Sequence, residues 1–475
     1  MQEFTKPPQG ILPSLRSTLL VLLMVCAGVG TVFGQDQAPQ KLSLDQAIQS
    51  ALANSADLEA AQADVRASEA RALAAKFKFI PGISASGSYT VLSELPPSTL
   101  TLPGGFSFDF PSAKSQAASF GLKLQYPVFT GFRLLEAAKI AELQTTSKEL
   151  GMELVQRALR FEVSRAYWEC LRATANVNML VSNRDVVLQF QQEIRSQVDL
   201  GLATSSDQLA ADQRLSAAEI SLNDATVMRN QAFVGLAMIV GRDDLAQALV
   251  SDSMTGKSPD KLSLPFDLDT SIEDALAAIK GPETDLAKGI EEALAKRPES
   301  KLSQLGVDIS EHAANAAAGG LFPSLTVFGD YTYANPNQRV FPPKDEFTGT
   351  WSLGAQVSID IGGIAGTLAQ MQAAQEDSAK AKAQSRKQRD QISLDLRSTT
   401  LTLNRNIADL NLSSTLVQQG NENLRVSSQK YDVGLVKRND LLDAQLALLR
   451  AQFALTNKQL DVVISWADYQ RASGQ

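Results

Sequence analysis

The chain contains very little cysteine and histidine, which excludes several kinds of active site. Of its 475 residues, two are cysteine and one is histidine. Cys26 lies in an apolar N-terminal segment, so Cys170 is left alone in the body of the chain and has no disulfide partner there. With His312 as the sole histidine, the usual zinc sites and Cys–His nucleophile pairs cannot be assembled. We therefore expect no catalytic residue, no metal site, no cofactor and no enzymatic activity.

The chain also lacks an excess of basic residues and a long apolar segment. It carries 44 Lys and Arg against 52 Asp and Glu, a net charge of −8, which disfavours nucleic acid as a partner. Beyond residue 34, no apolar run reaches the roughly 18 residues that a membrane-spanning helix needs. If the body of this chain crosses a membrane, we expect it to do so with β-strands.

Residues 1–34 are typical of a secretory signal peptide. Lys6 and Arg16 give a basic start, residues 19–29 form an apolar centre, and Val32-Phe33-Gly34 offers a cleavage site. The alternative is an N-terminal transmembrane anchor, for which the apolar run is short.

The body of the chain contains an internal duplication. Ala51-Leu52-Ala53-Asn54 recurs 242 residues later, as Ala293-Leu294-Ala295-Lys296. Gly201 and Asp207 recur after 233 residues, as Gly434 and Asp440. The difference between the two offsets places a loop in the first copy that is nine residues longer. We therefore predict a first repeat at 35–240, a linker at 241–285 and a second repeat at 286–475.

Four segments alternate between apolar and polar residues with the period of a β-strand. They are residues 83–91 and 119–127 in the first repeat, and 324–333 and 351–360 in the second. Their length and the aromatic residues near their ends fit a transmembrane barrel, although a half-buried soluble sheet shows the same alternation. Four strands cannot close a barrel, so a membrane sheet would need several chains. Two chains would give eight strands around a filled interior, and three would give twelve around a lumen.

Long helices are predicted between and after the strands. Residues 42–80 read as one helix ended by Pro81, and 92–118 as a loop. Residues 133–199 contain no proline and would form a helix roughly 100 Å long. Gly201 and Gly434 end helices, and Ser205/Ser206 and Asn439 are expected to open the next ones.

The helices that follow the second strand pair carry a heptad pattern of apolar residues. The positions seven apart are Leu396, Leu403, Leu410, Val417, Leu424 and Tyr431. This spacing predicts coiled-coil packing. Because the apolar stripes are narrow, we expect helices paired around water rather than around a solid core.

On these motifs, the chain resembles the TolC-type outer membrane efflux proteins of Gram-negative bacteria. The resemblance covers residues 41–472, and its motifs occur in the same order in both repeats. They are the helix opening Leu42–Leu52, the pairs Ile80-Pro81 and Phe322-Pro323 before a strand, the segment Tyr126-Pro127-Val128-Phe129-Thr130-Gly131, and the Gly-Leu turns at 201–209 and 434–442.

The resemblance implies a homotrimer that is a membrane β-barrel joined to an α-helical barrel. Each protomer would give four strands to a shared twelve-stranded barrel in the outer membrane, and its coiled-coil-like helices would form a periplasmic tunnel. Such proteins have no catalytic activity. They are exit channels for an inner-membrane pump and a periplasmic adaptor, in efflux or type I secretion. The rival interpretation is a soluble periplasmic coiled-coil adaptor or scaffold.

The resemblance also assigns residues at the periplasmic end. Asp440 and Asp443 match aspartates that line the aperture, while Asp207 and Tyr431 match residues that link neighbouring helices in the closed state. The family's arginine after the turn is replaced by Val436, which Lys437 and Arg438 follow, so the closing network is expected to be rewired. The residues that match the adaptor-docking turns are Gly201, Leu202, Gly434 and Leu435.

The chemistry of the aspartate pair can be stated from its spacing. Asp440 and Asp443 are three residues apart and share one face of a helix. In a trimer, six carboxylates would surround a constriction and attract cations. The alternative is a pair of acidic residues that stabilises the helix dipole, and the two roles are compatible.

Overall fold

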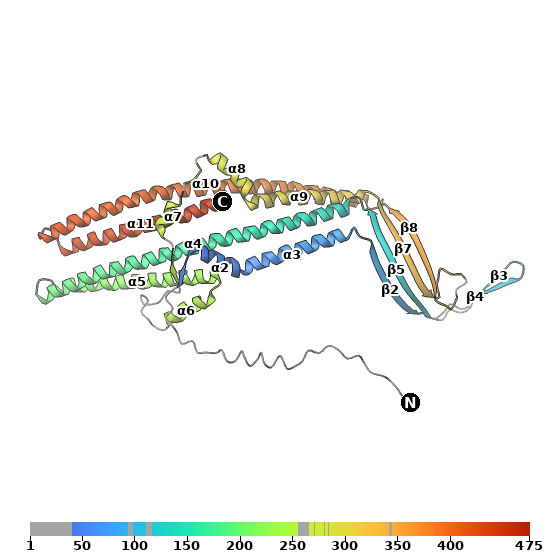
Figure 1. The fold of residues 1–475 in the computed structure, drawn as a ribbon, viewed down its shortest axis with the longest axis horizontal. Helices are drawn as coiled ribbons and strands as arrows, with labels where there is room; N and C mark the ends of the chain where they lie inside the picture. Colours follow the sequence, from blue (N-terminus) through green and yellow to red (C-terminus); the bar gives the residue numbers. More distant parts are fainter. Residues whose placement is uncertain are drawn as a thin grey trace, which may run out of the picture.

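The computed structural model describes residues 40–93, 98–110, 116–254, 266–269, 271–279, 281–283, 285–341 and 344–475. The predicted signal peptide lies outside these residues. The described chain is mostly helical and elongated, with a small sheet at one end and the turns of two helical hairpins at the other (Figure 1). Among the described residues, no helix is both long enough and apolar enough to cross a membrane.

The sheet at one end of the molecule has four antiparallel strands in the order β2-β5-β7-β8. The strands are β2 (Gly82–Val91), β5 (Gln116–Phe129), β7 (Ser324–Asn335) and β8 (Thr348–Ser358). Each repeat supplies two of them. The two edge strands, β2 and β8, therefore come from different repeats.

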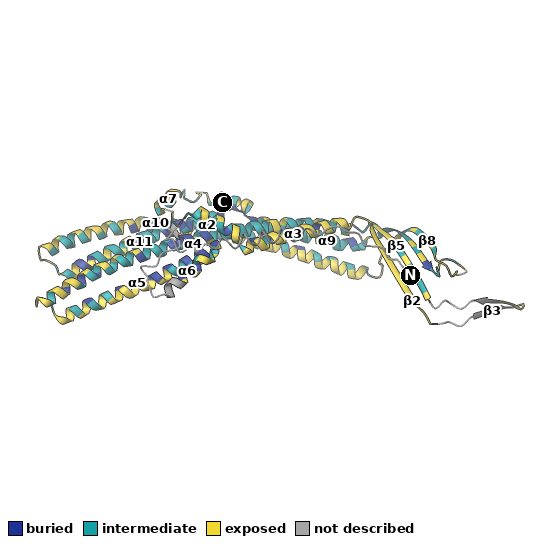
Figure 2. Ribbon diagram, turned by 60° about the horizontal axis from the view of Figure 1, so that its bottom comes forward, coloured by how far each residue is buried: buried dark blue, intermediate teal, exposed yellow. Residues whose placement is uncertain are grey.

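The strand register makes one face of the sheet apolar. Cross-strand neighbours lie on the same face, so each row of paired residues shows the character of that face. One row joins Ala85, Leu122, Tyr331 and Trp351, and its side chains are not covered by the rest of the chain: Trp351 is 75% exposed. Figure 2 shows the same exposure along β2, whereas buried residues concentrate in the middle of the molecule.

Two helical hairpins run away from the sheet. The first consists of α4 (Arg133–Asp199) and α5 (Ser205–Val240), and the second of α10 (Ile364–Asp432) and α11 (Arg438–Ser473). Helix α4 also packs along α11, which joins the two hairpins side by side. Two shorter helices, α3 (Ala56–Phe77) and α9 (Pro298–Ala318), pack along α4 and α10 near the sheet.

The predicted helix over 42–80 is two helices. Helix α2 (Leu44–Asn54) ends at Ser55, which accepts a hydrogen bond from the Leu58 N–H and so begins α3. The matching break in the second repeat separates α8 (Leu286–Lys296) from α9 at Arg297, where Pro298 takes the first helical position.

The predicted loop over 92–118 contains a β-hairpin. Strands β3 (Ser98–Leu102) and β4 (Phe106–Phe110) pair in antiparallel register, with Leu102 opposite Phe106. Gly104 and Gly105 take positive φ values between them, as a tight turn requires.

A solid core lies midway along the hairpins, contrary to the expectation of helices paired around water. It joins α2, α4, α5, α11 and α6 (Asp243–Met254), and includes Tyr167, Trp168, Phe233 and Leu460. The linker contributes α7 (Ile272–Ala277) and β6 (Phe266–Leu268), and β6 pairs in parallel with β1 (Gln40–Leu42). Apolar residues outside the narrow heptad stripes are therefore buried in this core.

Candidate functional site at the helix turns

The turn between α4 and α5 and the turn between α10 and α11 have the same backbone. In the first, the N–H groups of Gly201 and Leu202 donate to carbonyl oxygens in the last turn of α4, at 2.9 and 2.8 Å. In the second, Gly434 and Leu435 donate to the last turn of α10 at the same distances. The two glycines have φ values of 72° and 74°, where other residues are strained. Both turns are therefore fixed by the same helix-ending motif.

The side chains that begin α5 form a complete capping box. The Asp207 N–H donates to the Thr204 hydroxyl oxygen at 3.2 Å, and the Thr204 N–H donates to the Asp207 carboxylate at 2.9 Å. Thr204, rather than Ser205 or Ser206, is thus the cap. Hydrogen bonds from the Thr204 hydroxyl and N–H hold the pKa of Asp207 below its usual range, and the charge of Lys437 adds to this. The two turns of one chain are therefore close enough to interact electrostatically.

The start of α11 has only half of this arrangement. The capping position is Lys437, not Asn439, and its N–H donates to the Asp440 carboxylate at 3.0 Å. A lysine ammonium cannot accept a hydrogen bond, so the return bond from the helix is missing. Asp440 thus accepts a hydrogen bond at the start of its own helix. Asp443 is exposed one turn further along.

Arg438 links the two hairpins and was not identified from the sequence. Its guanidinium donates to both carboxylate oxygens of Glu193 on α4, one of them at 3.1 Å, and lies over the Tyr431 ring with 5.8 Å to the ring centroid. The Arg438 side chain is only 11% exposed, but that of Glu193 is 46% exposed, so solvent screens the pair in part. Arg438, two positions after Val436, thus makes a charged contact between the hairpins of one chain, while the rewiring of the closing network stays a prediction.

An apolar cluster reinforces this contact between the hairpins. Phe190 and Ile194 of α4 pack against Leu442 of α11 and Ala211 of α5. Within the described part of one chain, no hydrogen bond joins Tyr431 to Asp207, whose carboxylate accepts from Thr204 instead. The link predicted between them stays a prediction for contacts between chains.

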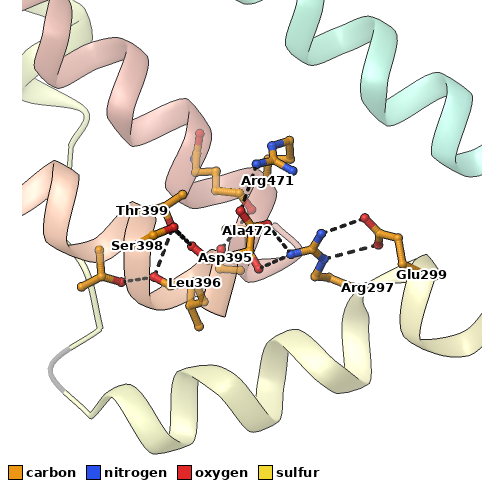
Figure 3. Close-up of polar contacts among 11 residues, drawn as sticks. Arg297, Glu299, Asp395, Leu396, Ser398, Thr399, Arg471 and Ala472 are labelled. Carbon is orange, nitrogen blue, oxygen red and sulfur yellow. Dashed lines mark hydrogen bonds and ion pairs between the residues drawn. The ribbon is translucent and has the colours of Figure 1, made fainter. Parts of the chain in front are cut away.

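A second polar cluster lies in the middle of the molecule, where the second repeat folds back on itself (Figure 3). Arg297 donates to Asp395 at 2.8 Å, to Glu299 at 2.8 Å and to the Ala472 carbonyl oxygen at 3.3 Å. Arg471 also donates to Asp395, at 3.4 Å. Burial opposes ionisation of Glu299, but the hydrogen bonds from Arg297 and from the backbone N–H of Glu299, together with the charges of Arg297 and Arg157, outweigh it and hold the pKa of Glu299 below its usual range.

The matching place in the first repeat uses neutral groups. Ser50 and Asn54 of α2 donate to the Val240 carbonyl oxygen at the end of α5, at 3.1 and 3.3 Å. The end of α5 is thus held by neutral hydrogen-bond donors, whereas the end of α11 is held by the charged Arg297. Over the described residues, no group of three or more His, Cys, Asp and Glu side chains is arranged to hold a metal ion.

The chain matches the family of outer membrane efflux proteins over residues 47–242 and 289–475, that is, over most of both repeats. It therefore belongs to this family, and it is an outer-membrane protein with a large periplasmic part. The members of the family are channel proteins rather than enzymes.

Two relatives and one solved structure illustrate the similarity. The outer membrane protein TolC of Vibrio cholerae is 22% identical over 339 residues, which cover 70% of this chain and 72% of that protein. The outer membrane efflux protein BepC of Brucella suis is 22% identical over 447 residues, which cover 94% of this chain and 88% of that protein. The crystal structure of a membrane protein from Pseudomonas aeruginosa has the same fold, with a TM-score of 0.71 and 19% identity. The match covers 91% of this chain and 93% of that one.

Proposed function

We propose that this protein is a homotrimeric exit channel of the outer membrane. It conducts substrates that an inner-membrane pump delivers through a periplasmic adaptor, and its aperture lies at the helix turns. The observation that carries the proposal is the open four-stranded sheet with one exposed apolar face, set at the end of two long helical hairpins.

The sheet supports a trimer because its two edge strands pair with no further strand among the described residues. β2 and β8 present free backbone groups, which is not tolerated in lipid unless another strand pairs with them. If β8 of one protomer pairs with β2 of the next, three protomers close a barrel of twelve strands. The apolar row through Trp351 then faces lipid, and the opposite face, which carries Lys123 and Asp330, lines the lumen.

The helices support a tunnel because they are far longer than a membrane is thick. Helix α4 has 67 residues and α10 has 69, which corresponds to roughly 100 Å each. The hydrocarbon core of a bilayer is about 30 Å thick. With the sheet in the outer membrane, the hairpins extend deep into the periplasm, and their turns lie at the far end.

The turns support both gating and docking. Asp440 and Asp443 of three protomers bring six carboxylates to one end of the tunnel, where they attract cations. Leu202 and Leu435 are 77% and 75% exposed at the outermost points of the turns and offer an adaptor apolar contacts. No enzymatic step and no cofactor is part of this function.

Membrane fractionation and conductance test the proposal. The mature protein should require detergent for extraction from the outer membrane, and should form channels in planar bilayers. Complete extraction without detergent would favour the soluble adaptor or scaffold and overturn the proposal.

Conductance also tests the role of the aspartate pair. A trivalent cation added on the side of the turns should block the channel, and Asp440→Ala with Asp443→Ala should relieve the block. The matched control is Asp432→Ala, which removes an exposed carboxylate on the other side of the same turn. If the double variant is blocked as strongly as the unaltered protein, the cation ring is ruled out.

A further inference from the structure

An open pocket lies where the first repeat passes from sheet to helices, at the place where α3 meets β2 and β5 meets α4 (Figure 1). Its volume is about 660 Å³, which is in the range of small-molecule sites. Two basic residues line it, Lys78 after the end of α3 and Arg133 at the start of α4, and among the described residues that line it none is acidic. Much of the remaining wall is apolar, and consists of Phe77, Ile80, Pro127 and Leu134.

The two basic side chains of the pocket are available to a ligand. Both are exposed, and within the described part of the chain neither forms an ion pair. The Arg133 Nε–H donates to the Thr130 carbonyl oxygen at 3.1 Å, which orients the guanidinium. No described residue accepts a hydrogen bond from its two terminal nitrogens. The pocket therefore combines two uncompensated positive charges with an apolar wall.

The pocket opens on the polar face of the sheet. Gln125 and Pro127 line it, and they lie two and four residues after Lys123 on β5. Because alternate residues of a strand share a face, all three lie on the face opposite Trp351. In the proposed barrel this face lines the lumen, so the pocket opens into the channel and not toward lipid.

The start of α4 separates the same two sides. Phe132 packs edge to face on Phe129, with 5.3 Å between the ring centroids, and Phe129 pairs with Leu325 on the apolar face of the sheet. Neither ring lines the pocket. Arg133 and Ala137 are four residues apart, share one face of the helix and do line it. The aromatic contact with the apolar face and the basic pocket thus belong to different sides of the junction.

The polar face of the sheet adds positive charge next to the pocket. Lys123 lies on this face, and its cross-strand neighbour is Asp330. The Asp330 carboxylate accepts hydrogen bonds from Arg339, at 2.6 Å, and from the Ser352 hydroxyl, so its charge is already matched within the chain. In a trimer, this end of the lumen would attract anions, whereas the aspartates at the helix turns attract cations.

The second repeat does not contain a matching pocket. The counterparts of Lys78 and Arg133 are Gly320 and Gly366, which have no side chain. The counterpart of Pro127 is Asp360, whose carboxylate accepts a hydrogen bond from the Gly363 N–H at 2.9 Å. The basic pocket is therefore not a consequence of the duplicated fold, and a trimer would have one in each protomer.

We propose that this pocket binds organic anions that carry an apolar body, such as aromatic sulfonates and carboxylates, on their way through the channel. The inference rests on the proposed trimeric channel and names a class of substrate for it. The Lys78 ammonium and the terminal nitrogens of Arg133 bind the anionic group. Phe77, Ile80 and Leu134 cover the apolar body. Because the pocket is open to the lumen, it holds such a substrate only briefly and raises its local concentration near the exit.

Channel block by naphthalene-2-sulfonate tests the site. The compound is added on the side of the sheet to channels in planar bilayers, and the concentration for half block is measured. Lys78→Gln with Arg133→Gln should raise that concentration roughly tenfold. Methanesulfonate lacks the apolar body and naphthalen-2-ylmethylammonium has the opposite charge, so each should block the unaltered channel less.

The matched control is Lys76→Gln with Lys139→Gln. These lysines lie on the same two helices, but both contact Glu142, at 2.9 and 3.5 Å, and neither lines the pocket. The control should be blocked like the unaltered protein. Equal weakening of the block in both double variants would show that the total charge of the protein causes the effect, and would overturn the site.

Lys78→Glu decides the matter if the loss of Arg133 disturbs the junction. Lys78 is exposed and forms no ion pair among the described residues, so this change should leave the fold intact. It should weaken block by naphthalene-2-sulfonate and strengthen block by the ammonium compound. Unaltered block by both compounds would overturn the pocket and leave the channel standing. A protein that forms no channels at all would overturn the channel and the pocket with it.

Discussion

The two repeats hold corresponding places with different chemistry. In the first repeat, Thr204 caps α5 and Asn54 donates to the end of the same helix, so neutral groups dominate. In the second repeat, Arg438 reaches across to Glu193 and Arg297 gathers two carboxylates. The duplication preserved the backbone and changed the electrostatics. The long-range contacts made by Arg297 and Arg438 of the second repeat therefore depend more on charge and salt than those of Asn54 in the first.

The largest expected effect is the loss of Arg297. Arg297→Ala leaves Asp395 and Glu299 without their buried partner, and we expect a loss of about 3 kcal/mol in the free energy of unfolding. Asn54→Ala, at the neutral counterpart, removes the hydrogen bond to Val240 and two local ones to Ser50, and should cost about 1 kcal/mol. Denaturant unfolding in detergent, followed by helical circular dichroism, compares them. If the two variants lose the same free energy of unfolding, the charged contact of the second repeat is no stronger than the neutral contact of the first.

Arg438 should have the next largest effect. Arg438→Ala removes the charged contact between the hairpins and should weaken it by about 1–2 kcal/mol, since Glu193 is partly exposed and screened. The turns should loosen, which hydrogen exchange at the start of α11 measures. Arg438→Lys keeps the charge but not the bidentate geometry, and should fall between the two. Exchange that is unaltered in Arg438→Ala would contradict a role in joining the hairpins.

Substitutions at the two helix caps should have smaller effects on stability, and the effects should be opposite in sign. Thr204→Ala removes the side-chain cap of α5 and should destabilise it by about 1 kcal/mol. Lys437→Thr completes the capping box at α11 and should stabilise that helix start by about 0.5–1 kcal/mol. Hydrogen exchange in the first turn of each helix reports both changes. If Lys437→Thr loosens α11, the lysine makes a contact that the cap does not replace.

The pH dependence of the first turn should be the smallest effect. The pKa of Asp207 is held below its usual value of 3.8, so the folded state favours the carboxylate. Its contribution to stability is full above that usual value and is lost as the pH falls through the lower folded value. Amide exchange of α5 should therefore accelerate below about pH 4. In Asp207→Asn this acceleration of exchange at low pH should vanish. If it persists, another group causes it.

Regular elements were predictable from the sequence because their signals are local. The proline-free run over 133–199 coincides with α4, and three of the four alternating segments lie within strands of the sheet, while the segment 351–360 runs two residues past the end of β8. Some local signals were overlooked. Phe106, Phe108 and Phe110 alternate with polar residues after Gly104-Gly105, which is a hairpin pattern, and Ser55 before an acidic turn is a helix start.

The contacts of the site were not predictable, because they join residues far apart in the chain. Arg438 and Glu193 are separated by 245 positions, and Arg297 and Asp395 by 98. Nothing in the residues around Arg438 distinguishes it from a solvated basic residue after a turn. Lys437 as a helix cap also runs against side-chain preference, because lysine offers no acceptor. Only the packing of α4 against α11 brings these groups together.

The proposed trimer requires that the open four-stranded sheet is completed by other copies of the same chain. Native mass spectrometry of the detergent-extracted mature protein tests it most directly. We expect one dominant species of three chains, whose mass falls to that of one chain when the sample is heated in denaturant. A dominant species of one or two chains would contradict the twelve-stranded barrel and, with it, the tunnel built on it.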